Sequence, residues 1–149
     1  MTIRPICEKD KSELIEIMTE FYSSPAVLAK PSKELFEKDI ADCLSDMPFV
    51  EGYVAECDGV IAGYTMVSKG YSTERGGICV QIEDLFVRSD FRGNGVGEKL
   101  LSYVEQTYKN VAARLRLEVE PSNLRALKLY ERCGFSELLY KQMIKELNK

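Results

Sequence analysis

A glycine-rich segment that follows a long apolar stretch is the part of the sequence best suited to chemistry. Residues 92–97 read Arg-Gly-Asn-Gly-Val-Gly and lie between an expected strand at 78–87 and an expected helix at 97–108. Glycine adopts backbone dihedral angles that other residues avoid and lets a ligand approach the chain closely. A helix that begins after such a loop presents unbonded N–H groups at the positive end of its dipole. The segment therefore predicts an anion site, most often for a phosphate group.

Two common phosphate-binding patterns do not fit this loop. The pattern G-x-x-x-x-G-K-[ST] is absent, and in the pattern G-x-G-x-x-G the third glycine would fall on Glu98. What remains is an arginine followed by two spaced glycines, R-x-x-G-x-G, from Arg92 to Gly97. From the loop alone, one alternative stays open, namely that it is a glycine-rich turn at the start of a helix and binds no ligand.

The composition limits which reactive groups are available. The chain has 149 residues and no histidine, which excludes serine–histidine–aspartate triads, cysteine–histidine pairs and histidine-based zinc sites. The five cysteines are scattered and form no Cys-x-x-Cys pair, so zinc and thioredoxin-like sites are not expected either. We expect these cysteines to be reduced core residues, and we expect no metal. Carboxylates, tyrosines, cysteines, lysines and backbone amides are left to carry any chemistry.

The charge and hydropathy of the chain limit its partners. Twenty Lys and Arg against 24 Asp and Glu give a net charge of −4, whereas nucleic-acid binders normally carry a basic excess. The N-terminus lacks the apolar core of a signal peptide, and no stretch approaches the ~20 apolar residues of a membrane span. The sequence therefore predicts a cytoplasmic protein with neither a nucleic-acid nor a membrane partner.

The spacing of apolar residues predicts one mixed α/β domain over residues 1–149, without repeats or linkers. Asp58-Gly59 between two apolar runs is a strong hairpin signal, because both central residues of the turn need a positive φ. The expected order is β-α-α-β-β-β-α-β-α-β. Strands are expected at 2–6, 50–57, 60–68, 78–87, 114–120 and 135–144, and helices at 8–22, from Ser32 to Pro48, at 97–108 and from Ser122 or Asn123 to Gly134.

Two motifs give the chain a family resemblance. The R-x-x-G-x-G loop after an apolar strand is similar to the coenzyme A pyrophosphate loop of the GCN5-related N-acetyltransferases, the GNAT family. Residues 123–135, Asn-Leu-Arg-Ala-Leu-Lys-Leu-Tyr-Glu-Arg-Cys-Gly-Phe, resemble the N…A…LYE..GF helix of that family. The motifs stand in the family's order and at its usual distance, and the expected elements agree over nearly the whole chain. Residues 82–87 further resemble the corresponding strand of the diamine and polyamine acetyltransferases.

The resemblance implies where acetyl-CoA would bind. Its pantetheine arm would pair with the backbone of Leu85, Phe86 and Val87, and an N–H near Leu85 or Phe86 would polarise the thioester carbonyl. Asn123 would lie near the pantetheine or the thioester, although it also suits the N-cap of a helix. The pyrophosphate would be wrapped by Arg92, Gly93, Asn94, Gly95, Val96 and Gly97.

The resemblance also implies an acid and a base. Tyr130 is the expected general acid, since the pKa of a phenol, about 10, is near enough to that of a thiol, about 8.5, for protonation of a leaving thiolate. Glu83 is the expected base, directly or through water. Because Glu83 and Asp84 are adjacent on a strand, we expect them to point to opposite faces. Acidic side chains of the first two helices either line the acceptor entrance or form solvated faces: Glu13, Glu16, Glu20, Asp39, Asp42 and Asp46.

Three functions stay open at this stage. The leading hypothesis is acetyl-CoA-dependent N-acetylation of a small amine, a polyamine or a peptide amine by direct attack in a ternary complex. The alternatives are an acyl-CoA-binding regulatory module without turnover and a phosphate- or nucleotide-binding module unrelated to coenzyme A. Polyamines, aminoglycosides, amino acids and protein amines all stay open as acceptors. Dimers are common in the family, so a homodimer is one expected assembly.

Overall fold

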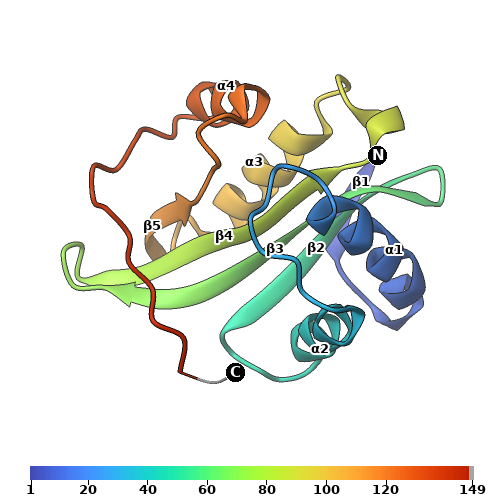
Figure 1. Ribbon diagram of the computed structural model, residues 1–149, viewed down its shortest axis with the longest axis horizontal. Coiled ribbons are helices and arrows are strands. Elements are labelled where there is room, and N and C mark those ends of the chain that lie inside the picture. Colours follow the sequence, from blue (N-terminus) through green and yellow to red (C-terminus); the bar gives the residue numbers. More distant parts are fainter. Residues whose placement is uncertain (148–149) are drawn as a thin grey trace.

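The computed structural model describes residues 1–147, which form a five-stranded sheet with helices on both faces (Figure 1). The strands lie side by side in sequence order, and β1 to β4 form antiparallel pairs, whereas β4 and β5 are parallel. The strands are β1 (Thr2–Pro5), β2 (Val50–Cys57), β3 (Val60–Ser72), β4 (Gly77–Val87) and β5 (Ala112–Leu117).

Two apolar clusters explain how the helices cover the sheet. The helices α1 (Lys11–Tyr22) and α2 (Lys33–Leu44) cover one face, whereas α3 (Val96–Tyr108) and α4 (Leu124–Arg132) lie on the other. The first cluster contains Leu14, Ile17, Met18, Phe21, Phe36, Ile40, Tyr64 and Phe86. The second contains Val67, Val80, Ile82, Leu101, Val104 and Tyr108.

Most predicted elements are confirmed, with shifted ends. Asp58 and Gly59 adopt φ values of 51° and 81°, and they join β2 and β3 as the hairpin pattern requires. The strand β3 is longer than expected and pairs with β4 up to Ser72 and Gly77, so the connection between the two strands is reduced to the turn at 73–76. The first helix is preceded by a separate 3₁₀ turn at Glu8–Asp10. The five cysteines are free, but they are half-buried instead of fully buried.

The expected final strand at 135–144 is wrong for the part of the chain that the structure describes. Residues 135–147 have no regular secondary structure, and several of their apolar side chains are exposed. The physical reason lies in the pattern, because apolar residues come in adjacent pairs, Leu138-Leu139 and Met143-Ile144. A strand places neighbouring side chains on opposite faces, so it would need cover on both faces to bury such pairs, and these side chains are exposed.

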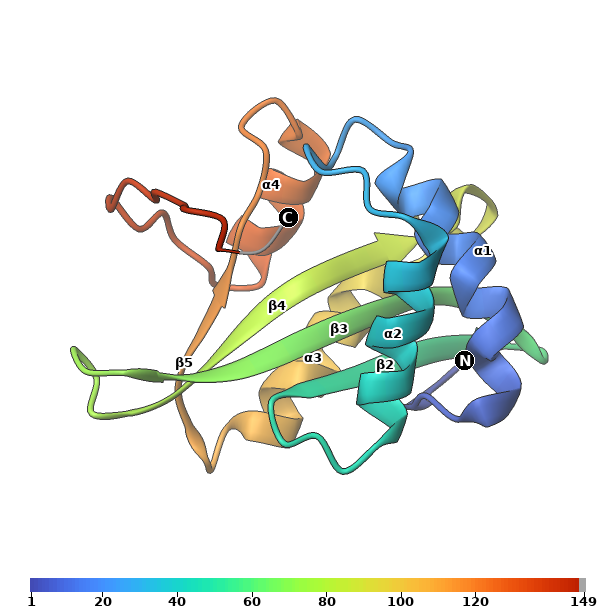
Figure 2. The same ribbon diagram turned by 60° about the horizontal axis from the view of Figure 1, so that its bottom comes forward.

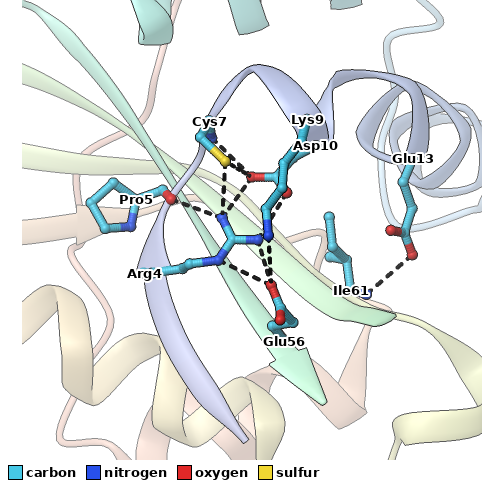
Figure 3. A network of polar contacts seen from close by, with 8 residues as sticks. All are labelled: Arg4, Pro5, Cys7, Lys9, Asp10, Glu13, Glu56 and Ile61. Carbon is cyan, nitrogen blue, oxygen red and sulfur yellow. Dashed lines mark hydrogen bonds and ion pairs between the residues drawn. The ribbon is translucent and has the colours of Figure 1, made fainter. Parts of the chain in front are cut away.

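A polar network around Arg4 ties the N-terminal strand to β2 and to the 3₁₀ turn (Figure 3). The guanidinium donates to the two carboxylate oxygens of Asp10 at 2.7 and 2.8 Å and to Glu56 Oε2 at 2.5 Å. Asp10 is 4% exposed and also accepts from the backbone N–H of Cys7 at 2.8 Å. The hydrogen bonds from Arg4 lower the pKa of the Asp10 carboxyl from 3.8 to about 2.

Replacing Asp10 should therefore destabilise the fold and change its acid sensitivity. Asp10→Asn removes the buried one of the two carboxylates that bind Arg4 and leaves only Glu56 as its paired charge, so we expect a loss of about 2 kcal/mol at pH 7. Because the folded-state pKa is depressed, this stabilisation is present above the unfolded-state pKa of 3.8 and is lost as the pH falls through about 2. Urea unfolding at pH 7 and at stepwise lower pH measures both effects.

The control is the exposed pair of Lys38 and Asp42 on α2. Asp42→Asn should cost less than about 1 kcal/mol, because exposed ion pairs contribute little. Equal losses of unfolding free energy in Asp10→Asn and Asp42→Asn would contradict the role given to Asp10. So would a stability difference between the wild type and Asp10→Asn that does not shrink at low pH.

Candidate active site

The strands β4 and β5 separate after Ile82. Their parallel pairing runs from Ile78 and Ala112 to Ile82 and Leu117, whereas β4 continues along β3 as far as Val87. Beyond β5 the chain rises away from β4 towards α4 (Figure 2). Among the described residues, the edge of β4 that faces away from β3 therefore has no strand partner over 83–87. Residues of both strands line a cavity of about 1640 Å³ at this point.

A β-bulge in β4 lies where the two strands separate. Asp84 pairs with Met66 on β3 and Ile82 pairs with the next residue, Val67, so Glu83 has no residue opposite it. An extra residue of this kind bends the strand and redirects the side chains beyond it. The alternation along β4 is therefore shifted by one position after Glu83.

Glu83 and Asp84 consequently lie on the same face of the sheet, the one covered by α1 and α2. The Ser68 hydroxyl donates to Glu83, and the hydroxyls of Tyr22 and Tyr64 donate to Asp84 at 2.7 and 2.8 Å. The expectation of opposite faces is wrong, because the bulge adds one residue to the strand. Glu83 is exposed and lines the cavity, whereas Asp84 is 4% exposed. Burial raises the pKa of the Asp84 carboxyl to about 6, despite the two phenol hydrogen bonds.

The glycine-rich loop leaves six consecutive backbone N–H groups, those of residues 93–98, without a hydrogen bond to any described residue. Gly93 and Gly95 have φ values of 84° and 73°, in the left-handed region that favours glycine. Gly95 is the N-cap of α3, so several of these groups point outward at the positive end of that helix. Most of the loop lines the cavity, and the predicted anion site therefore opens onto the gap beside β4.

Hydrogen bonds at the end of β4 show which backbone groups face the gap. The backbone N–H of Arg88 donates to the carbonyl of Ala62 on β3 at 2.9 Å. Because N–H directions alternate along a strand, the N–H of Phe86 also faces β3, whereas the N–H of Leu85 faces the gap. The Val87 carbonyl agrees with this alternation, since it accepts from Arg92 Nε at 2.8 Å. The Arg92 guanidinium also lies 5.3 Å from the ring centre of Phe86. Of the two expected donors, the geometry favours Leu85.

The helix α4 brings Tyr130 to the opposite side of the cavity. Asn123 caps this helix and accepts from the Ala126 N–H at 3.2 Å, as its position predicts. Gly97 allows α3 and α4 to approach closely, because a Cβ there would lie 3.1 Å from a methyl group of Leu129. Tyr130 is half-buried and lines the cavity, and burial raises its pKa to about 12. The phenol is therefore protonated at neutral pH.

Some parts of the cavity wall carry no sequence signal. These parts are Tyr22, the loop at 24–29 and Ile144. The sequence indicated the loop only through two prolines, Pro25 and Pro31. The acidic residues of the first two helices are not among the described lining residues, so the solvated-face alternative is the better one. Glu13, for example, pairs with Arg88 at 2.9 Å.

The profile of the Acetyltransferase (GNAT) family matches residues 12–135 of the chain. The chain belongs to the GNAT family of acetyltransferases. It is an N-acetyltransferase, and its mixed α/β fold is the one that the resemblance implied, apart from the missing final strand. Within the described residues, no helix combines the length and apolar character needed to cross a membrane. Nor do three or more His, Cys, Asp or Glu side chains gather there in a way that suits a metal ion.

Relatives in sequence and structure extend this assignment. Thialysine N-epsilon-acetyltransferase from Bos taurus is 29% identical, over 91% of this GNAT chain and 84% of the relative. An uncharacterized N-acetyltransferase from Methanocaldococcus jannaschii is 30% identical, over 92% of this chain and 79% of the relative. The solved structure of aminoglycoside N-acetyltransferase AAC(6')-Iy in complex with CoA has a TM-score of 0.82 at 19% identity and covers 99% of this chain and 95% of its own. That likeness concerns the fold alone.

Proposed function

We propose that the protein transfers an acetyl group from acetyl-CoA to a primary amine by direct attack in a ternary complex. The observation that carries the proposal is the row of unbonded N–H groups at residues 93–98, which opens beside the free edge of β4. A diphosphate needs several donors at a positive helix end, and this loop supplies them from the backbone. Cytoplasmic location and a homodimer stay predictions.

The residues at the site fit acetyl-CoA. The diphosphate would rest on the loop amides, with Arg92 adding a positive charge and Gly93 and Gly95 keeping the surface open. The Val96 side chain is 3% exposed, so only its backbone would take part. The pantetheine arm would lie along Leu85–Val87 in the place that β5 vacates, and Asn123 would flank it. The relative crystallised with CoA has the same fold, which supports this arrangement.

The chemistry divides between three groups of the chain. Acetyl-CoA, when bound, supplies the acetyl group as an activated thioester. Glu83 would take the proton of the acceptor ammonium, directly or through water, and leave a neutral amine. The Leu85 N–H would stabilise the charge that develops on the carbonyl oxygen, an effect of roughly 3–4 kcal/mol in other enzymes. As the N–C bond forms and the C–S bond breaks, Tyr130 would give its proton to the departing sulfur, and the proton that the attacking nitrogen still loses would pass through water and restore the phenol.

The raised pKa of Tyr130 is compatible with this role. The same dry surroundings that raise the pKa of the phenol to about 12 would also raise that of a thiol beside it. The difference between the two groups is therefore smaller than the value for Tyr130 alone suggests. Relatives named for an N-epsilon amine and for aminoglycosides support an amine as acceptor.

A thiol-release assay with acetyl-CoA and a panel of amines tests the proposed function directly. We expect amine-dependent release of free CoA and an acetylated product seen by mass spectrometry. If acetyl-CoA binds but stays intact with every amine, the regulatory-module alternative holds. If ATP or NAD binds as well as CoA, the site is a general phosphate site.

Gly95→Val should weaken CoA binding by about 100-fold or more. A valine strongly disfavours the positive φ of Gly95, so the loop amides would lose their arrangement. Isothermal titration of CoA measures the change. The matched control is Gly76→Val, which imposes similar strain at φ 63° in the turn between β3 and β4, at the other end of β4 and outside the cavity, and should leave CoA affinity unchanged. Unaltered CoA binding by Gly95→Val would place the diphosphate elsewhere.

Tyr130→Phe should lower kcat by about 100-fold with little change in acetyl-CoA affinity, since it removes the proton donor but keeps the ring. Steady-state kinetics and titration separate the two quantities. Tyr103→Phe is the control, because Tyr103 is also half-buried on a helix but does not line the cavity. Normal turnover in Tyr130→Phe would remove this residue from the mechanism.

A further inference from the structure

One wall of the cavity comes from the end of α1 and the loop behind it, and we name residues 21–29 the loop wall. Figure 2 shows this segment and α4 above β4, and residues of both line the same cavity as Glu83 and Leu85. The opposite wall holds the glycine-rich loop and α4, which we assign to acetyl-CoA. The loop wall is therefore the surface left for the acceptor.

The loop wall offers the acceptor no charge and no free hydroxyl proton. Its sequence is Phe-Tyr-Ser-Ser-Pro-Ala-Val-Leu-Ala. The hydroxyl of Tyr22 is bound to Asp84, and that of Ser24 donates to the carbonyl of Phe21 at 2.6 Å. Ser23, which does not line the cavity, donates its hydroxyl back to α1 at 2.7 Å. The side chains of the loop wall would therefore give a ligand rich in hydroxyl or ammonium groups neither a charge nor a donor to replace its hydrogen bonds to water.

Two exposed apolar side chains meet the cavity from opposite ends of the chain. Leu28 is 87% exposed and belongs to the loop wall, and Ile144 is 86% exposed and comes from the C-terminal segment. Each methylene that such a surface removes from water improves affinity about fourfold. An apolar ligand group is therefore the partner that this surface would favour.

Among the described residues that line this side of the cavity, Glu83 is the one exposed carboxylate that can attract an ammonium. Glu83 is exposed, whereas Asp84 behind it is buried under Tyr22 and Tyr64. The other lining carboxylates lie on the far wall, at the start of α3 or after β5: Glu98, Glu118 and Glu120.

We propose that the acceptor is a monoamine on an apolar body, with its amine at Glu83 and its apolar part against Leu28 and Ile144. This inference rests on the proposed function and narrows its substrate class. It separates the protein from enzymes for polyamines or aminoglycosides, whose acceptors carry several ammonium or hydroxyl groups.

The first test compares three acceptors in the thiol-release assay: n-hexylamine, 1,6-hexanediamine and kanamycin. The first two have the same carbon chain and differ only in a second ammonium group. We expect kcat/KM for n-hexylamine to exceed that for 1,6-hexanediamine by about tenfold or more, with kanamycin poorer still. Equal or better use of the diamine or kanamycin overturns the inference but leaves the proposed function intact. If none of the amines causes release of CoA, or if release is the same in the absence of any amine, the proposed function is overturned. The inference is then overturned as well.

The second test uses variants matched in exposure. Leu28→Ser should raise KM for n-hexylamine about fivefold and leave kcat and acetyl-CoA affinity unchanged. Leu139→Ser is the control, because Leu139 is 88% exposed and does not line the cavity. Ile144→Ser and its neighbour Met143→Ser, which is 90% exposed in the wild type and outside the cavity, form a second pair.

Thermal melting of all four variants should match the wild type, because none of the changed side chains is buried. Equal KM values in Leu28→Ser and Leu139→Ser would overturn the inference. A loss of acetyl-CoA affinity in Leu28→Ser would overturn it too, since coenzyme A and not the acceptor would then cover the loop wall.

Discussion

The separation of β4 from β5 is the constraint on which the rest of the site depends. A strand that ends at Leu117 while its partner continues to Val87 leaves backbone donors and acceptors without a protein partner. Backbone groups of this kind are costly to leave unpaired away from water, so such an edge favours an extended ligand with its own amides. The bulge at Glu83 lies at the same point and bends the strand there. The bulge therefore lies where the gap begins, and it also places Glu83, the expected base, on the face where an acceptor can reach it.

The chemistry that we propose uses the main chain for binding and very few side chains for reaction. Loop amides, a strand N–H and the end of α3 would hold and polarise acetyl-CoA, whereas Glu83 and Tyr130 would move protons. This division explains how a chain without histidine can carry out acyl transfer. It also explains why the positive φ of Gly93 and Gly95 matters more than any side chain of the loop. Specificity for the acceptor then falls to a separate surface, the loop wall.

The sequence predicts local structure well wherever one residue type is required by one backbone conformation. Asp58-Gly59, the glycines of the loop, the Asn123 cap and Gly134 at φ 85° are all of this kind. It could not predict the bulge, because that depends on how β3 pairs with β4 at Met66 and Val67. For the same reason, the sequence could not predict that Glu83 and Asp84 lie on the same face. The loop wall has no periodicity, and its position depends on tertiary contacts such as that of Tyr22 with Asp84. The final strand was expected from β-prone residues, but a strand with adjacent apolar residues needs cover on both faces, which depends on tertiary packing.

A crystal structure of the protein with CoA tests the central claim most directly. We expect diphosphate oxygens within hydrogen-bonding distance of the N–H groups of residues 93–98. We also expect the pantetheine amides alongside Leu85–Val87, in the gap that β5 leaves. CoA bound in another crevice, or bound here with its diphosphate away from those N–H groups, would contradict it.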